Sequence, residues 1–133
     1  MGEIKKTKQP LAKKEEMRID ANLRTDRRVL IGEPLVIANK FASGKVIKNL
    51  KVEHPEPPFI IVLENGSVTE ADSLLFKASG IITRTGNRLS HLAVVARELD
   101  IPYVNKIDIN MIKENCKAII LITEEDAKVI LED

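Results

Sequence analysis

The chain has 133 residues, of which 44% are hydrophobic, and its formal net charge at pH 7 is +1. This length is enough for one domain with an apolar core, and the absence of tryptophan with only 3% aromatic residues makes that core aliphatic. The balanced charge gives no argument for nucleic-acid or membrane binding, and one cysteine with two histidines excludes an internal disulfide and does not supply a zinc site. No apolar run approaches the roughly 20 residues that span a bilayer. Because the N-terminus also lacks the apolar segment of a signal peptide, we expect a cytoplasmic protein.

Residues 1–28 differ in composition from the rest of the chain. They contain nine Lys or Arg against five Asp or Glu, and few apolar residues separate the charges. We expect a basic, flexible N-terminal extension over 1–28 and the folded domain over 29–133. The rival interpretation is an arm that binds an acidic partner or RNA. The extension has no aromatic residue on which bases would stack, which argues against RNA.

From residue 29 the pattern predicts short strands first and then strands alternating with helices. This order is typical of an α/β domain. A turn at Ala42-Ser-Gly44 is expected to separate the first two strands. The expected strands are Pro34–Ala38, Lys45–Ile47, Phe59–Leu63, Gly80–Thr83, Pro102–Val104, Lys117–Thr123 and Lys128–Leu131, and the expected helices are Thr69–Lys77, Leu92–Leu99 and Asn110–Glu114.

One histidine, His91, is placed by the sequence at the start of a helix. Apolar residues recur with helical spacing from Leu92 to Leu99, Ser90 is a good N-cap, and Pro102 follows the helix end. The unpaired N–H groups and dipole of a helix start disfavour an imidazolium, so we expect a neutral, nucleophilic ring. The same N–H groups suit phosphate oxygens. Spacing alone, however, favours a surface histidine with no chemistry.

The polar turn before the helix offers further candidates for phosphate binding. Thr85, Gly86 and Asn87 lie in or beside this turn, and Ser90 adds a hydroxyl. The hydroxyls of Thr83 and Thr85 would bond either a phosphate or the turn backbone, with Thr85 the better candidate. For Arg97, two turns along the helix, a surface role and a role in steadying the turn remain equally open. Arg84 and Arg88 suit phosphate, although charged turns are usually only solvated.

The whole segment from Gly80 to Pro102 resembles the signature of the phosphohistidine, or swivelling, domain of phosphoenolpyruvate-utilising enzymes. That family includes pyruvate phosphate dikinase, phosphoenolpyruvate synthase and enzyme I of the sugar phosphotransferase system. Ala42-Ser-Gly-Lys-Val46 and Pro58–Leu63 resemble earlier parts of the family pattern, and the resemblance extends over about residues 30–132. The matching positions of the signature are Gly80, Thr83, Gly86, Ser90, His91, Ala93, Val95, Ala96, Arg97, Glu98, Leu99, Ile101 and Pro102.

The resemblance implies a three-layer β/β/α swivelling domain that carries a phosphoryl group on Nε2 of His91. In such enzymes a nucleotide-binding domain charges the histidine from ATP, and a barrel domain works on pyruvate or phosphoenolpyruvate. This sequence has no Gly-rich Walker loop. We therefore expect a free-standing carrier that binds no cofactor itself. Mg²⁺ with ATP, or phosphoenolpyruvate, would belong to partner chains.

The sequence departs from the family pattern at four places, and two of them, Asn87 and Leu89, together with the lack of attached domains, keep a second interpretation open. Asn87 replaces a glycine in the turn, and Asn tolerates left-handed backbone better than most residues. Leu89 replaces a hydroxyl residue, Asp100 replaces a glycine after the helix, and Asn105-Lys106 replace Val-Gly. The alternative is a regulatory or anion-binding module that keeps the fold without phosphotransfer. The other histidine, His54, lies between prolines and is expected to be exposed and inert.

Overall fold

The computed structural model describes residues 27–37 and 41–132. The expected extension over residues 1–28 therefore lies outside the described residues, except for its last two positions. In the described part of the chain, no helix is long and apolar enough to cross a membrane. The elements in chain order are β1 (Arg27–Val36), β2 (Phe41–Ile47), β3 (Phe59–Asn65), α2 (Asp72–Leu75), β4 (Gly80–Thr85), α3 (His91–Leu99), β5 (Tyr103–Asn105), the 3-10 helix η3 (Ile109–Met111), β6 (Lys117–Ile122) and β7 (Ala127–Glu132).

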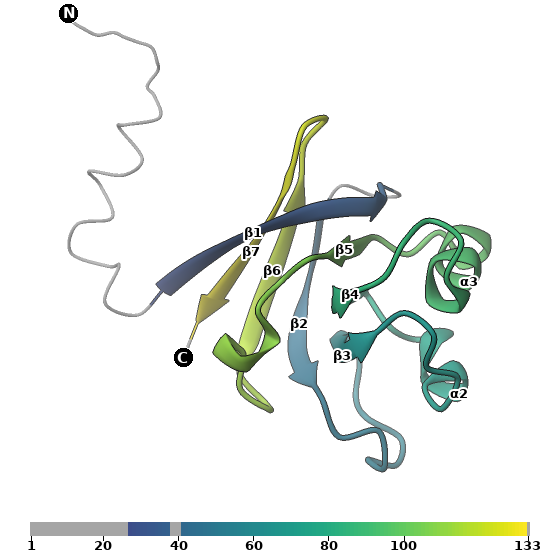
Figure 1. Ribbon diagram of the computed structural model, residues 1–133. Helices are drawn as coiled ribbons and strands as arrows, with labels where there is room; N and C mark the ends of the chain where they lie inside the picture. The colour runs from purple at the N-terminus through teal and green to yellow at the C-terminus, as the bar shows by residue number, and fades with distance from the viewer. Residues whose placement is uncertain (1–26, 38–40, 133) are drawn as a thin grey trace, which may run out of the picture.

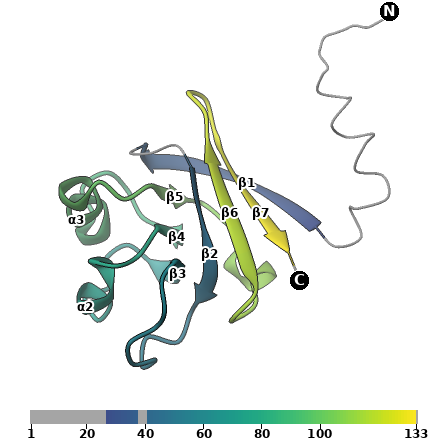
Figure 2. The same ribbon diagram turned by 180° about the vertical axis from the view of Figure 1, so that it is seen from behind.

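The strands form one mixed sheet that closes into a barrel in the order β1-β5-β4-β3-β2-β6-β7 (Figures 1 and 2). Pairing is parallel from β2 through β3 and β4 to β5, and antiparallel elsewhere. The long strand β1 closes the barrel by pairing with β7 over residues 27–32 and with β5 over residues 33–36. The chain is therefore an α/β domain in which the sheet dominates.

Two apolar cores lie on opposite faces of the parallel strands. Ile60 and Val62 of β3 point into the barrel, where they pack with residues of β6 and β7. Ile61 and Leu63 point outward and pack beneath α2 and α3, which Figure 1 shows together on one side of the barrel. Parallel strands that are buried on both faces read as continuous apolar runs. This explains why Phe59–Leu63 contains no polar alternation.

The helices confirm one sequence prediction and correct two. The predicted helix before Pro102 is α3, and it ends at Asp100 in the left-handed conformation, with φ 60° and ψ 47°. The N–H of Ile101 then donates to the carbonyl of Ala96 at 2.9 Å. The predicted helix over 69–77 shrinks to the four residues of α2, whose N-cap is Ala71 rather than Thr69, and the one over 110–114 is the 3-10 turn η3.

The predicted hairpin around Ala42-Ser-Gly44 is wrong. These three residues lie inside β2, and β2 pairs with β3 and β6 but not with β1. Gly44 is required by close packing rather than by a turn, since a Cβ there would lie 2.7 Å from the carbonyl carbon of Pro58. Strand β1 also begins at Arg27, well before the predicted Pro34.

The outer face of the sheet is covered by helices over β3 but exposed on β1. The same Ile→Ala substitution should therefore lower the free energy of unfolding by different amounts on these two strands. Ile61 is fully buried under the helices, whereas Ile31 on β1 is 59% exposed. We expect Ile61→Ala to lower the free energy of unfolding by about 2–5 kcal/mol, because it leaves a cavity. Ile31→Ala, the matched control, should cost less than about 1 kcal/mol. Urea denaturation measures both values, and equal losses would contradict the described helix packing.

Candidate functional site

The site forms where β3 and β4 end beside each other. The strands run parallel, with Asn65 opposite Thr85 at their carboxyl ends. The loops that follow are joined by two backbone hydrogen bonds: the N–H of Gly66 donates to Thr85 at 2.9 Å, and the N–H of Leu92 donates to Gly66 at 2.8 Å. Helices α2 and α3 follow these loops. The topology therefore brings their first residues together, although the sequence separates them.

His91 is the first residue of α3, and its ring contacts the first residue of α2. Nε2 lies 2.9 Å from Oδ1 of Asp72 and 3.2 Å from Oδ2. The side chains are 36% and 50% exposed, respectively. An ionised carboxylate only accepts hydrogen bonds, so Nε2 carries the proton in this contact. In a neutral ring the lone pair is then on Nδ1. The sequence analysis did not identify Asp72.

The turn before α3 is shaped by hydrogen bonds of Asn87. Its side-chain oxygen accepts from the N–H of Leu89 at 2.8 Å, and its carbonyl accepts from the N–H of Ser90 at 3.1 Å. Asn87 itself does not adopt left-handed backbone, because among the described residues only His54, Asp100, Lys106 and Asn115 have positive φ. Ser90 is the N-cap residue as predicted, yet its hydroxyl makes no capping bond and donates to the Asn87 carbonyl at 2.7 Å.

Arg97, on α3, restrains the turn through a hydrogen bond. Its Nη2 donates to the carbonyl of Arg88 at 2.7 Å, which favours the steadying role over that of a free surface arginine. Leu89, between the turn and His91, is 86% exposed. An open hollow of about 730 Å³ lies next to the turn, but His91 is not among its lining residues, which are Glu33, Leu35, Asn87, Arg88, Leu89 and Arg97.

A chain of hydrogen bonds between side chains of β4 and β5 also supports the turn. Thr83 Oγ1 donates to Asn105 Oδ1 at 2.9 Å, so the hydroxyl of Tyr103, 2.8 Å away, donates to Thr83. The amide of Asn105 donates to the carbonyl of Gly86 at 2.9 Å. Gly86 is required here, since a Cβ would lie 2.7 Å from the Tyr103 hydroxyl. The Asn105 departure from the family pattern thus anchors the turn, while Lys106 adopts the positive φ, 63°, that a glycine would favour.

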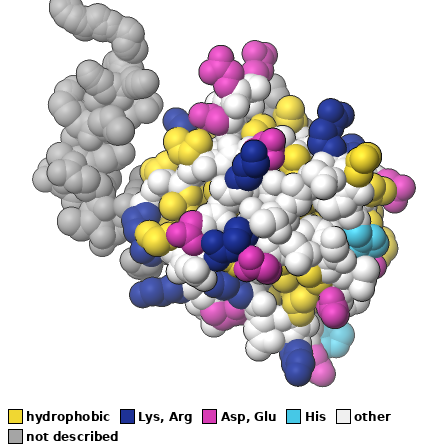
Figure 3. Space-filling view, in the orientation of Figure 1, with side chains coloured by type: hydrophobic (Ala, Val, Ile, Leu, Met, Phe, Trp, Pro, Cys, Tyr) yellow, Lys and Arg dark blue, Asp and Glu magenta, His cyan; other side chains and the backbone are white. Residues whose placement is uncertain are grey.

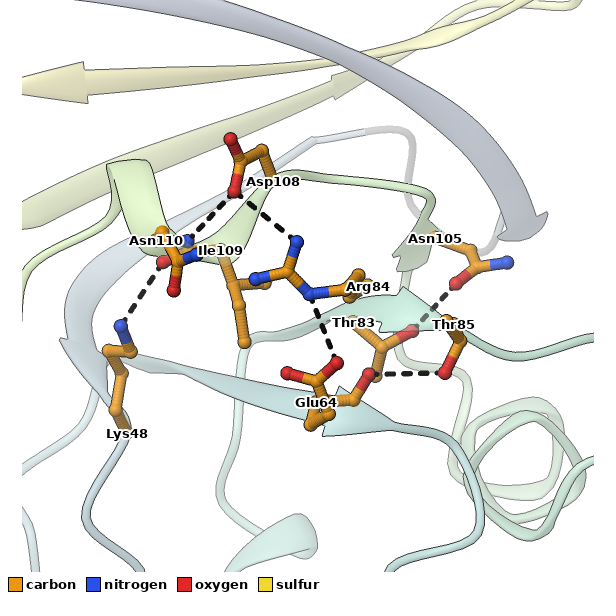
Figure 4. A network of polar contacts seen from close by, with 9 residues as sticks. All are labelled: Lys48, Glu64, Thr83, Arg84, Thr85, Asn105, Asp108, Ile109 and Asn110. Carbon is orange, nitrogen blue, oxygen red and sulfur yellow. Dashed lines mark hydrogen bonds and ion pairs between the residues drawn. The ribbon is translucent and has the colours of Figure 1, made fainter.

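Several predicted phosphate contacts are already used by the protein (Figure 4). Thr83 is buried in the network just described, and the Thr85 hydroxyl donates to the carbonyl of Glu64 at 3.3 Å. Arg84 lies between two carboxylates, with Nε 3.0 Å from Glu64 and Nη1 3.4 Å from Asp108. The Thr85 hydroxyl and the Arg84 guanidinium therefore already have partners within the protein.

At the helix start, some anion-binding capacity remains. The N–H of Leu92 is taken by Gly66, whereas the N–H groups of His91 and Ala93 have no acceptor within the described ranges. His54 is exposed, as expected, and Figure 3 shows the two histidines as separate cyan patches on the surface. Among residues 27–37 and 41–132, no three His, Cys, Asp or Glu side chains gather as a metal site requires.

These features define an α/β domain that presents one accessible histidine at a helix start. The family described as PEP-utilising enzyme, mobile domain, matches residues 55–127, more than half of the chain. The chain belongs to this family. It is also 31% identical over 77 residues to phosphoenolpyruvate synthase of Escherichia coli K12, a match that covers 56% of this chain and 10% of that protein. The chain thus corresponds to a small part of that relative.

A solved structure supports the fold alone. Aconitase X from Thermococcus kodakaraensis, in its holo form, superposes with a TM-score of 0.53 over 77% of this chain and 98% of that chain, at 17% identity. At this identity the similarity concerns the arrangement of strands and helices. It says nothing of the chemistry at His91.

The buried phenol of Tyr103 predicts a pH dependence of stability. Burial raises its pKa above the ordinary 10.0, while hydrogen bonds to Thr83 and Ser90 oppose the shift. The folded state favours the neutral phenol. The contribution of this group to the free energy of unfolding is therefore fully present below pH 10 and is lost as the pH rises towards the folded-state pKa. We expect the thermal midpoint of the wild type to fall more steeply than that of Tyr103→Phe from about pH 9 to about pH 11. Parallel curves would contradict the burial of this hydroxyl.

Proposed function

We propose that this domain carries a phosphoryl group on His91 between an ATP-binding partner and a site of the pyruvate or phosphoenolpyruvate type. The observation that carries the proposal is the position of His91 at the start of α3, partly exposed, in a chain of the PEP-utilising mobile domain family. That family supports a phosphoryl-carrier type of domain in general. The relative named phosphoenolpyruvate synthase favours an acceptor or donor of that chemistry.

The proposed reaction divides one difficult transfer into two. A ring nitrogen of His91 attacks the phosphorus of the donor, the bond to the leaving oxygen breaks, and the resulting phosphoramidate later reacts with the acceptor. Such transfers depend mainly on positioning and on stabilising charge. Here Ser90 and Asn87 shape the turn at Gly86, Arg97 holds it, and the N–H groups of His91 and Ala93 remain for phosphate oxygens. The metal ion and nucleotide would be held by the partner.

We further propose that the domain moves as a three-layer β/β/α swivelling unit. The barrel contributes two β layers with an apolar core between them, and α2 and α3 form the third layer over β3 to β5. A rigid unit of this kind would move His91 between two sites without changing its surroundings. Such a movement would deliver the phosphoryl group from one partner domain or chain to another, so that donor and acceptor need not lie at the same site.

A non-covalent anion-binding or regulatory module is the second candidate. It is favoured by one observation: Nε2 of His91 already contacts the Asp72 carboxylate, whereas an anion at the N–H groups of His91 and Ala93 would need no ring nitrogen. In this function the helix start would bind an anion reversibly and signal it to a partner. No bond to phosphorus would form.

Phosphorylation assays on histidine variants test the first candidate. The protein should gain one phosphoryl group when mixed with a cognate ATP-binding chain, or with phosphoenolpyruvate and a barrel chain. Because the bond is a phosphoramidate, the label should be lost in mild acid and retained in base. His91→Ala should abolish labelling with an unchanged fold, since the side chain is partly exposed. The control, His54→Ala, should label as the wild type does.

Two outcomes would redirect the assignment. Label on Ser90 or His54 would refute His91 as the carrier. An absence of label with all such partners, combined with phosphate-induced shifts of the amide signals of residues 86–92 in an NMR titration, would favour the anion-binding module.

Ser90→Ala should slow transfer by loosening the turn, because it removes the bond to the Asn87 carbonyl.

A further inference from the structure

The contact between Asp72 and His91 lies at the nitrogen that the proposed phosphoryl transfer uses. Oδ1 of Asp72 is 2.9 Å and Oδ2 is 3.2 Å from Nε2, and Nε2 is the atom at which the family resemblance places the phosphoryl group. In residues 27–37 and 41–132, no other hydrogen bond or ion pair involves the ring. A carboxylate and a phosphoryl group therefore compete for one side of the imidazole.

We propose that Asp72 weakens the retention of the phosphoryl group on His91, so that the domain releases the group to an acceptor more readily than it would without this carboxylate. This effect rests on the proposed function, because it concerns a phosphoryl group on Nε2 of His91. It does not depend on which nitrogen is protonated in the free ring. Two features of the site lead to it: the space beside Nε2 and the charges that are present after transfer.

The space beside Nε2 does not accommodate both groups. In the transfer, the lone pair of Nε2 forms the N–P bond while the bond between phosphorus and the leaving oxygen breaks, and any proton on Nε2 has left the ring by then. A hydrogen bond and an N–P bond use the same in-plane direction of this nitrogen. The phosphorus atom would also lie closer to Nε2 than the Asp72 oxygens do. The contact seen in the free domain is therefore lost when His91 is charged.

The Asp72 carboxylate cannot withdraw far from the charged ring, because α2 is held by its apolar neighbours. Ala71, directly before Asp72, and Leu75, at the end of α2, are fully buried. Both belong to the core that also packs under α3. Asp72 itself is half exposed, so its side chain can rotate towards solvent while its main chain stays in place. The carboxylate then remains a few ångströms from the group on His91.

The charges that are present after transfer repel each other. A phosphoryl group adds close to two negative charges near neutral pH, and the Asp72 carboxylate adds another on the same side of the ring. Both side chains are partly exposed, so water weakens this repulsion. For charges a few ångströms apart in a water-like medium, the repulsion shifts the equilibrium between charged and free carrier by about tenfold.

The start of α3 acts in the opposite direction. The N–H groups of His91 and Ala93, which have no acceptor within the described ranges, and the positive end of the helix dipole favour the bound phosphoryl group. A carrier has to accept the group from one partner and yield it to another. Asp72 and the helix start together would keep the charged and free forms close in free energy.

Phosphoryl exchange with imidazole tests the effect of Asp72 without any partner chain. The full chain is charged with phosphoramidate, whose N–P bond breaks with release of ammonia, and imidazole is then added at alkaline pH. Transfer from His91 to imidazole breaks one N–P bond and forms another, so its equilibrium constant reports the surroundings of His91. We expect 31P NMR to show about tenfold stronger retention by Asp72→Asn than by the wild type. Glu70→Gln, which removes an exposed carboxylate two residues away, should match the wild type.

Salt dependence separates a charge effect from a structural one. The difference between the wild type and Asp72→Asn should shrink when the ionic strength rises from about 0.01 M to about 1 M, since the screening length falls from about 30 Å to about 3 Å. Asp72→Glu restores a carboxylate and should return the equilibrium towards that of the wild type. A merely structural role for Asp72 would give a difference that salt does not change.

Three results would overturn the inference: equal or stronger retention by the wild type, a difference that is the same at low and high salt, and no charging of His91 in Asp72→Asn by phosphoramidate. Failure of the proposed function would look different. No partner would then transfer a phosphoryl group to His91, while the imidazole equilibrium would still differ between the wild type and Asp72→Asn.

Discussion

Parallel pairing between β3 and β4 is the constraint on which the site depends. The register runs from Ile60 opposite Gly80 to Asn65 opposite Thr85, so both strands end at the same level. Each is followed by a helix on the outer face, because a parallel connection has to cross back over the sheet. Ile61, Leu63 and Ile81 are buried beneath α2 and α3, and this packing fixes the position of both helices on the sheet. His91 and Asp72 meet as a consequence of this packing.

A second constraint is the buried polar network that supports the turn. Burying the hydroxyls of Thr83 and Tyr103 with the amide of Asn105 is costly unless each group is satisfied. The chain of bonds from Tyr103 through Thr83 and Asn105 to the Gly86 carbonyl provides the partners. A network of this kind defines one position for the turn. The bond from Arg97 to the carbonyl of Arg88 restrains the turn further.

The sequence predicted what depends on local pattern. The helical spacing of Leu92 to Leu99 gave α3, the apolar run gave β3, and the family signature identified His91 and its turn. It did not predict the course of β2, because Ala42-Ser-Gly44 has the composition of a turn while Gly44 in fact serves close packing against Pro58. Nor did it predict the conformation of Asn87, whose side chain shapes the turn without left-handed backbone.

Asp72 was missed for a physical reason. It lies 19 positions before His91, in a short polar stretch with no periodicity, and only tertiary structure brings the two together. A signal was present in the topology, since two helices that follow neighbouring parallel strands must begin side by side. Asp72 is also an acidic residue in the first turn of its helix. Asp72 can be identified in this way only after the pairing of β3 with β4 is known.

If His91 is the phosphoryl carrier that we propose, the protein carries the group in the cell. Intact-mass measurement on the protein purified from its native host, kept at alkaline pH throughout, tests this. We expect a fraction of molecules that is heavier by one phosphoryl group, loses this mass in mild acid and yields a modified peptide containing His91. A protein that is wholly unmodified under every growth condition, or an acid-stable modification at another residue, would contradict it.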